Sequence, residues 1–140
     1  MIVIKFVGHE NILGIHFNTF EFTADAHLTK KGDCIIGVNS RFDFKGLGKK
    51  LKDSRPIRVK GRIIVSLNEQ KYADKFEGVL NKKFEPDSKE IVFRKSRFDS
   101  SRTLVVECNK SARELDRKLI KALKNPEARG ECIINFEIEK

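Results

Sequence analysis

The feature that most constrains the fold is a regular alternation of apolar and polar residues between positions 57 and 67. Odd-numbered positions are apolar apart from Gly61, and even-numbered positions from 58 to 62 are all cations. Successive side chains of a strand point to opposite faces of a sheet, so this stretch predicts a strand with one buried face. Residues 131–139 repeat the alternation with Glu131, Glu137 and Glu139 on the polar face. We therefore expect sheets with one apolar and one charged face.

Most other apolar runs are short and rich in β-branched residues, which also favours strands. Two of them, at residues 33–39 and 102–109, carry Ile, Val, Leu or Cys at both odd-numbered and even-numbered positions. They predict strands that are buried on both sides. Four further strands are predicted at residues 2–7, 12–23, 72–76 and 91–95.

Two segments have the spacing of helices. The earlier one lies between Ser40, a candidate N-cap, and Pro56, and two glycines lower its helix propensity by about 1 kcal/mol each. The later one opens with Ser111 and Glu114 at the spacing of a capping box and ends before Pro126. The apolar stripe of the earlier helix is Phe44, Leu47 and Leu51.

The order of the predicted elements repeats in the two halves of the chain. A shift of 70 residues pairs Phe6 with Phe76, and a shift of 69 pairs Gly61 with Gly130. Few residues are identical, so the shared order of the elements is the stronger argument for an internal duplication.

Two strand-rich repeats of this length cannot each bury an apolar face alone and should pack on one another. We therefore predict a single domain over residues 1–140 with internal pseudo-repeats at 1–70 and 71–140. The predicted fold class is mainly β with two helices (α+β), a jelly-roll-like β-sandwich or barrel built from two duplicated halves.

The composition indicates a soluble and basic protein. Lys and Arg number 29 against 20 Asp and Glu, which gives a formal net charge of +9 over 140 residues. No apolar run is long enough to span a membrane, and the apolar start is interrupted by Lys5, too early for a signal peptide. The three cysteines lie in apolar runs without a Cys-x-x-Cys spacing, which favours reduced thiols. We expect a cytoplasmic protein without membrane contact.

Positive charge is concentrated in residues 41–62, where nine cations and two acids carry +7 of the net +9. A helix and a strand would each align three of these cations on one face. Such a surface suits phosphates, because each neutralised phosphate releases counterions. We predict a non-catalytic binding module for nucleic acid, RNA more than DNA, or another polyanion. The predicted contacts are Lys45, Lys49, Lys52, Arg58, Lys60 and Arg62.

Two other interpretations of this surface stay open. The cations could form an ordinary solvated face, partly neutralised if the acidic strand at 131–139 lies beside residues 57–67. The same complementarity could join two chains, which would make the protein a homodimer or a homo-oligomeric assembly module. A second basic cluster could extend the surface: Arg94, Lys95, Arg97 and Arg102.

An enzymatic alternative centres on His9, His16 and Asp33. Two imidazoles and a carboxylate could hold a metal or transfer protons in a metal-assisted, hydrolase-type reaction. The spacing of the histidines matches no established ligand motif, and it places them on opposite faces of an unbroken strand unless Gly14 marks a bulge. Structural roles in turns fit both histidines better, so we expect no cofactor and binding rather than catalysis.

Five stretches of the chain resemble a family of archaeal proteins known as domain of unknown function three-seventy-one. The resemblance implies a mainly β, jelly-roll-like fold in a cytosolic archaeal protein, and it implies no activity. The resembling stretches are Gly-His-Glu-Asn-Ile at 8–12, Leu-Thr-Lys-Lys-Gly-Asp-Cys-Ile-Ile-Gly-Val at 28–38, Arg-Lys-Ser at 94–96, Arg-Thr-Leu at 102–104 and Lys-Ser-Ala-Arg-Glu-Leu-Asp-Arg at 110–117.

Overall fold

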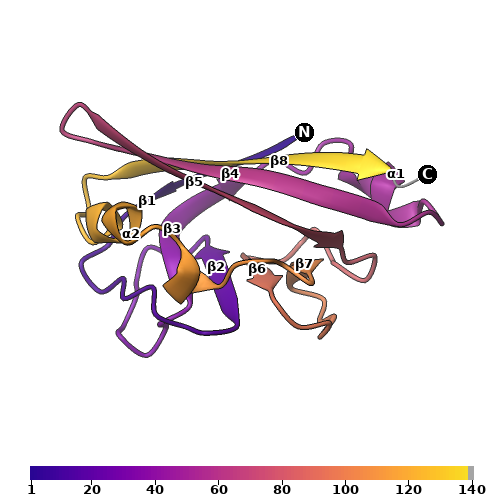
Figure 1. Ribbon diagram of the computed structural model, residues 1–140, viewed down its shortest axis with the longest axis horizontal. Coiled ribbons are helices and arrows are strands. Elements are labelled where there is room, and N and C mark those ends of the chain that lie inside the picture. The colour runs from indigo at the N-terminus through magenta and orange to yellow at the C-terminus, as the bar shows by residue number, and fades with distance from the viewer. Residues whose placement is uncertain (139–140) are drawn as a thin grey trace.

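The computed structural model describes residues 1–138 as a closed barrel of eight strands with two short helices. The elements are β1 (Ile2–Val7), β2 (Thr19–Thr23), β3 (Ile35–Phe42), α1 (Leu47–Lys52), β4 (Ile57–Leu67), β5 (Gln70–Leu80), β6 (Glu90–Arg94), β7 (Thr103–Val106), α2 (Arg117–Leu123) and β8 (Arg129–Ile138). Around the barrel the strands follow the order β1-β3-β2-β6-β7-β5-β4-β8. Figure 1 shows β4, β5 and β8 in one layer, β2, β6 and β7 in the other, and the helices near opposite ends of the long axis.

Each strand pairing of the first half has a counterpart in the second half. The β1–β3 and β5–β7 pairs are antiparallel, and the β2–β3 and β6–β7 pairs are parallel. The antiparallel β1–β8 pair corresponds to the β5–β4 pair. These two pairs join the halves, as do β2–β6 and β4–β8. The mainly β, α+β prediction is confirmed. The jelly-roll order is not, because two pairs are parallel, and the duplication stays a prediction with which this topology agrees.

Aromatic rings fill the interior of the barrel. Phe20, Phe22, Phe76 and Phe93 are fully buried and contact one another with centroids 4.5 to 6.2 Å apart. Most of these pairs are T-shaped, the geometry that the charge distribution of aromatic rings favours. Both halves of the chain contribute rings, so they share a single core.

Two glycines leave room for rings on the neighbouring strand. Gly61 on β4 lies opposite Phe76 on β5, and Gly130 on β8 lies opposite Phe6 on β1. A Cβ atom at either glycine would overlap the facing ring. A glycine therefore occupies the apolar face of β4 because a ring from the next strand already fills that place.

The largest error of the sequence prediction concerns the strand at 12–23. Only Thr19–Thr23 forms a strand, and residues 12–18 form a loop instead. Gly14 has a φ of 58° in this loop, where a Cβ would meet the side chain of Ile120 on α2. The loop bends because it packs against α2, a contact between distant parts of the chain that local spacing does not encode.

Both helices are shorter than predicted. Ser40 lies within β3 rather than capping a helix, and α1 begins after Gly46, which has a φ of 85°. The capping box at Ser111 and Glu114 is present, but it caps a single 3-10 turn. The Asp116 carboxylate then accepts bonds from two backbone N–H groups and starts α2 anew. Among residues 1–138 no helix is long and apolar enough to cross a membrane.

Candidate functional site

The three predicted cations of β4 lie in one row, and acids reach part of it. Arg58 stands opposite Glu137 on β8, and the Lys60 Nζ atom lies 3.6 Å from the Glu137 Oε1 atom. Arg62 instead stands opposite Lys75 on β5. The row is therefore neutralised at the end near α1 and cationic toward its other end.

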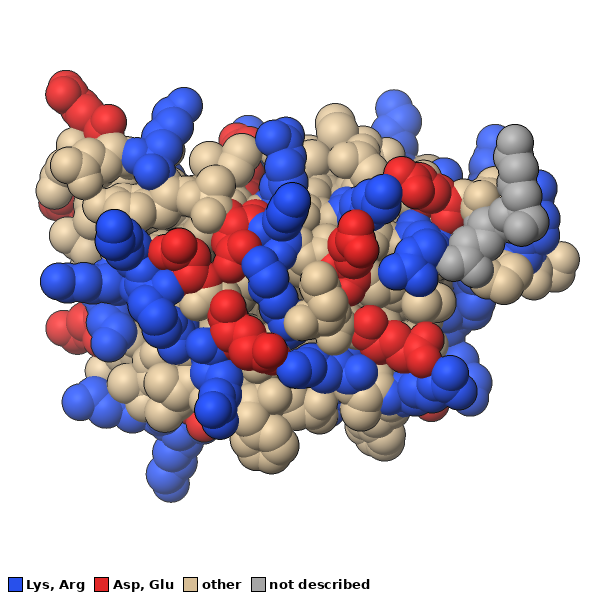
Figure 2. Space-filling view, in the orientation of Figure 1, with Lys and Arg blue, Asp and Glu red and all other residues tan. Residues whose placement is uncertain are grey.

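The acidic strand does lie beside β4, as one interpretation of the sequence required, but it covers little of the basic row. On the β4 side Glu131 stands opposite Ile64 rather than opposite a cation of the row. Of the described acids on β8, Glu137 faces the row, and Glu139 lies outside the described residues. On the other side of the row, Glu77 of β5 stands opposite Lys60. Figure 2 shows the same mixture on one face of the molecule, where acidic groups separate several groups of Lys and Arg.

The other three predicted cations belong to the α1 region. Lys45 precedes the helix, whereas Lys49 and Lys52 lie in it, and all three are exposed. Within the described part of the chain none of the three forms an ion pair. The neighbouring Lys50 lies over the ring of Phe136, 5.6 Å from its centroid. Because Phe136 stands opposite Val59, this contact places α1 near the start of β4. Whether the helix and strand cations act together stays a prediction.

A groove crosses the outer face of β3, β1, β8, β4 and β5 at the end of β4 that lies away from α1. Its volume is about 590 Å³. It contains four cations from four strands, one acid and a floor that includes Gly130. The residues that line the groove are Lys5, Phe6, Val7, Asn39, Arg41, Ile64, Ser66, Lys71, Arg129, Gly130 and Glu131.

Two cations of the groove lie on directly opposed positions of adjacent strands, and the other two flank a residue of β4. Lys5 stands opposite Arg41 on one side and opposite Glu131 on the other. In the next row Ser66 stands between Arg129 and Lys71. Directly opposed side chains are about 4.5 to 5.5 Å apart at their Cβ atoms, so Lys5 and Arg41 lie close together, while Arg129 and Lys71 are one strand further apart.

Ion pairs leave most of this charge uncompensated. Lys5, Arg41 and Lys71 are exposed and make no ion pair with any residue from 1 to 138. The Arg129 guanidinium donates to the carbonyl oxygens of Pro126 and Ala128 and so is positioned without being neutralised. An arrangement of this kind can bind phosphate or carboxylate groups.

Sequence reasoning missed the groove because its cations come from separate strands. Each is a single Lys or Arg at an outward position, outside the dense segment at 41–62 apart from Arg41. A bulge also contributes, since the register between β1 and β3 shifts between Lys5 and Val7, where Asn39 has a φ of 51°. Strand pairing, which the sequence does not state, brings these residues together.

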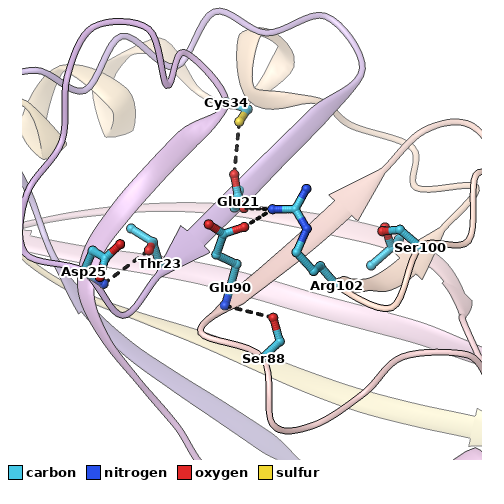
Figure 3. A network of polar contacts seen from close by, with 9 residues as sticks. Glu21, Thr23, Asp25, Cys34, Ser88, Glu90, Ser100 and Arg102 are labelled. Carbon is cyan, nitrogen blue, oxygen red and sulfur yellow. Dashed lines mark hydrogen bonds and ion pairs between the residues drawn. The ribbon is translucent and has the colours of Figure 1, made fainter.

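A second polar site, the Glu21 cluster, consists of Glu21, Cys34, Glu90 and Arg102. Figure 3 shows the Arg102 guanidinium beside both carboxyl groups, with the Cys34 thiol on the far side of Glu21. Arg102 pairs with Glu90, and its Nη1 atom lies 3.6 Å from the Glu21 Oε1 atom. The Cys34 thiol donates to the Glu21 Oε2 atom at 3.2 Å. β2 is buried along its whole length, and Glu21 is only 7% exposed.

Burial controls the protonation of this cluster. Loss of solvation raises the pKa of the Glu21 carboxyl to about 7, and a hydrogen bond with Glu90 adds to the shift. Burial and the neighbouring Glu21 raise the pKa of the Cys34 thiol to about 12. Cys34 is therefore a thiol rather than a nucleophilic thiolate at neutral pH, and Glu21 can hold a proton there.

The structure does not assemble His9, His16 and Asp33 into a reaction centre. The His9 Nδ1 atom accepts from the Asn11 N–H, so this imidazole stabilises its own turn. The His16 Nδ1 atom accepts from two backbone N–H groups in the same manner. Asp33 contacts His16 through its backbone carbonyl oxygen, which accepts from the His16 N–H. In the described range of the chain no group of His, Cys, Asp or Glu could hold a metal ion. The metal-assisted hydrolase alternative therefore has no geometric support.

Comparisons with known proteins identify the family of the chain, and that family has no assigned activity. A protein of Methanocaldococcus jannaschii named as uncharacterized is 32% identical over 123 residues, which cover 87% of this chain and 90% of that protein. The family profile of a domain of unknown function, DUF371, matches residues 4–139. These matches confirm the resemblance seen in the sequence, and the chain belongs to the DUF371 family.

Proposed function

We propose that the protein is a non-catalytic binding module whose basic outer face contacts a polyanion, foremost a nucleic acid and RNA before DNA. One observation carries the proposal: Lys5 and Arg41 stand directly opposite one another on adjacent strands. Like charges at opposed positions destabilise a strand pair, and an anion between them would relieve the repulsion. Departures from such local rules are expected at functional sites.

The form of the groove supports a phosphate-bearing ligand. About 590 Å³ is within the range of binding sites, roughly 300 to 1,000 Å³. Cations from β3, β1, β8 and β5 surround its floor, so phosphates could be contacted from several sides. Ile64 and Val7 offer apolar surface beside these charges for the sugar or base of a nucleotide.

The predicted residues of β4 enter this proposal unequally. Arg62 lies two positions from Ile64 in the same strand, so its side chain adjoins the groove on the outer face. Lys60 already has Glu137 as a partner. The groove rather than α1 is therefore the proposed centre of binding, with Arg62 and Lys75 as its extension along β4 and β5.

The test is a mobility-shift titration of generic RNA and DNA over a salt series with two triple variants of equal charge. Replacement of Lys5, Arg41 and Lys71 by Ser should weaken binding at low salt at least about tenfold. It should also reduce the slope of log K against log salt by about 2, since each lost phosphate contact removes about 0.7 for a single strand. The comparison variant replaces Lys45, Lys49 and Lys52 by Ser and should lose clearly less affinity than the groove variant, since these lysines lie outside the groove.

Three outcomes would contradict the proposal. The wild-type protein could fail to retain RNA or DNA at low salt, or the groove variant could bind as tightly as the wild type. An equal loss in both variants would show that only net charge matters. Gel filtration of the same samples separates binding of the polyanion from association of the protein with itself.

A further inference from the structure

Two phenylalanine rings are exposed on loops that flank one end of the β2–β6 pair. Phe17 is 70% exposed and Phe98 is 62% exposed. Phe17 precedes β2 and Phe98 follows β6, and the two strands are antiparallel with Thr19 opposite Arg94. The Lys95 N–H also donates to the Asn18 carbonyl oxygen at 2.9 Å, which continues the pairing beyond the strand ends. The two rings therefore emerge close to the same strand ends.

Each ring is held from one side by a flat polar group. The His16 imidazole stacks on Phe17 with centroids 5.2 Å apart and an angle of 6° between the planes. The guanidinium carbon of Arg94 lies 4.9 Å from the centroid of Phe98. His16 is itself fixed, because its Nδ1 atom accepts from the backbone of Asn18 and Thr19. Each ring is therefore oriented with its remaining face toward solvent.

Basic side chains surround the two rings. Lys95 pairs with Glu114 and Arg97 pairs with Glu107, each at 2.6 Å. Arg113 lines a shallow depression with Phe17 and has no ion pair in the described portion of the chain. Exposed ion pairs contribute only about 0 to 1 kcal/mol, so phosphates can compete for the paired cations.

We propose that Phe17 and Phe98 form a stacking platform for the bases of a single-stranded nucleic acid, with its phosphates near Lys95, Arg97 and Arg113. Exposed aromatic rings beside cations are the usual means of binding single strands. The bases of a duplex are already stacked, so a duplex cannot use the platform. A protein partner would bury the rings without needing flat groups behind them. The platform lies on loops next to β2 and β6, and no residue of those strands lines the groove, so the inference does not depend on the proposed function.

The chain has no tryptophan, so Phe17→Trp and Phe98→Trp each place a single indole in the platform. We expect a 12-nucleotide oligoadenylate RNA to quench the fluorescence of both variants. A duplex of the same length and inorganic polyphosphate should leave it nearly unchanged. In the wild-type background, Phe17→Leu and Phe98→Leu should each weaken binding of the oligonucleotide about fivefold or more, because a base stacks on a ring and not on an alkyl group. Ile15→Ala is the matched control, since Ile15 is an exposed apolar residue of the same loop.

Four results would overturn the platform: no quenching by the oligonucleotide, equal quenching by polyphosphate, equal affinity after both Leu substitutions, or an equal loss in Ile15→Ala. Fluorescence that changes with protein concentration alone would assign the rings to a contact between two copies. The groove variant carrying Phe98→Trp should still be quenched. Failure of the groove and failure of the platform are therefore distinguished in one set of titrations.

Discussion

The groove and the Glu21 cluster contain the same kinds of charged side chain on opposite sides of the barrel and treat them differently. In the groove Lys5 faces Arg41, and both side chains are exposed. In the Glu21 cluster Arg102 lies beside two carboxyl groups, and Glu21 is almost completely buried. The groove cations, which water reaches, are thus not neutralised by ion pairs. The charges of the Glu21 cluster, which loops cover, neutralise one another. Because burial of an unpaired charge is costly, the charges of the cluster are accounted for by one another, and the groove is where binding should be sought.

The difference originates in loops rather than in strands. Both sites use outward positions of the sheet, but Cys34 and Arg102 come from the segments that follow β2 and β6 and lie over that part of the barrel. No residue from those two segments lines the groove. An outward position of this barrel therefore becomes buried or exposed according to the connection next to it.

The largest effect should come from the floor of the groove, where the surface meets the core. Gly130→Ala places a Cβ against the Phe6 ring, and Phe6 is fully buried in the barrel. Overpacking of a filled core costs typically 1 to 3 kcal/mol, and we expect about 3 kcal/mol less free energy of unfolding in chemical denaturation. The floor of the groove therefore stabilises the fold, whereas the exposed cations above it are proposed to bind the ligand.

Gly48→Ala is the matched control for that experiment. Gly48 lies in α1, and nothing lies within 4 Å of a Cβ built there. Replacement of an exposed helical glycine by Ala should raise the free energy of unfolding by up to about 1 kcal/mol. If Gly130→Ala were as stable as the wild type, the close packing of Phe6 on Gly130 would be wrong.

The second effect concerns the Glu21 cluster and depends on pH. The pKa of Glu21 is raised to about 7 from an ordinary value near 4.5, so the folded protein binds a proton that the unfolded chain has released. The free energy of unfolding should therefore fall as pH rises from about 4.5 to about 7. Glu21→Gln mimics the protonated form and should make the protein more stable than the wild type by about 2 kcal/mol at pH 8, with no gain at pH 4. Parallel profiles of the two proteins in urea denaturation would contradict this assignment.

The sequence predicted the parts of the fold that repeat locally and missed the parts that depend on distant contacts. The alternation at 57–67 identified β4, and the capping box at Ser111 was present. In the strand expected at 12–23, residues 12–18 form a loop because Gly14 packs against Ile120, which is distant in the sequence. Alternation places Glu21 on an outward face, but its burial follows from loops over β2. The groove follows from pairing of five strands, which no single segment reveals.

The smallest effect is expected when one arginine from each region is replaced by Gln. Arg102→Gln leaves Glu21 and Glu90 without their shared cation, and we expect about 1 kcal/mol less free energy of unfolding at pH 8. At pH 5 the loss should shrink, because Glu21 is then protonated and needs no counter-charge. Arg41→Gln removes one of two facing cations in the groove and should leave stability unchanged or raise it by a few tenths of a kcal/mol. Equal losses in the two variants, measured in parallel urea titrations, would mean that the groove arginine is a structural residue and that its opposition to Lys5 carries no functional information.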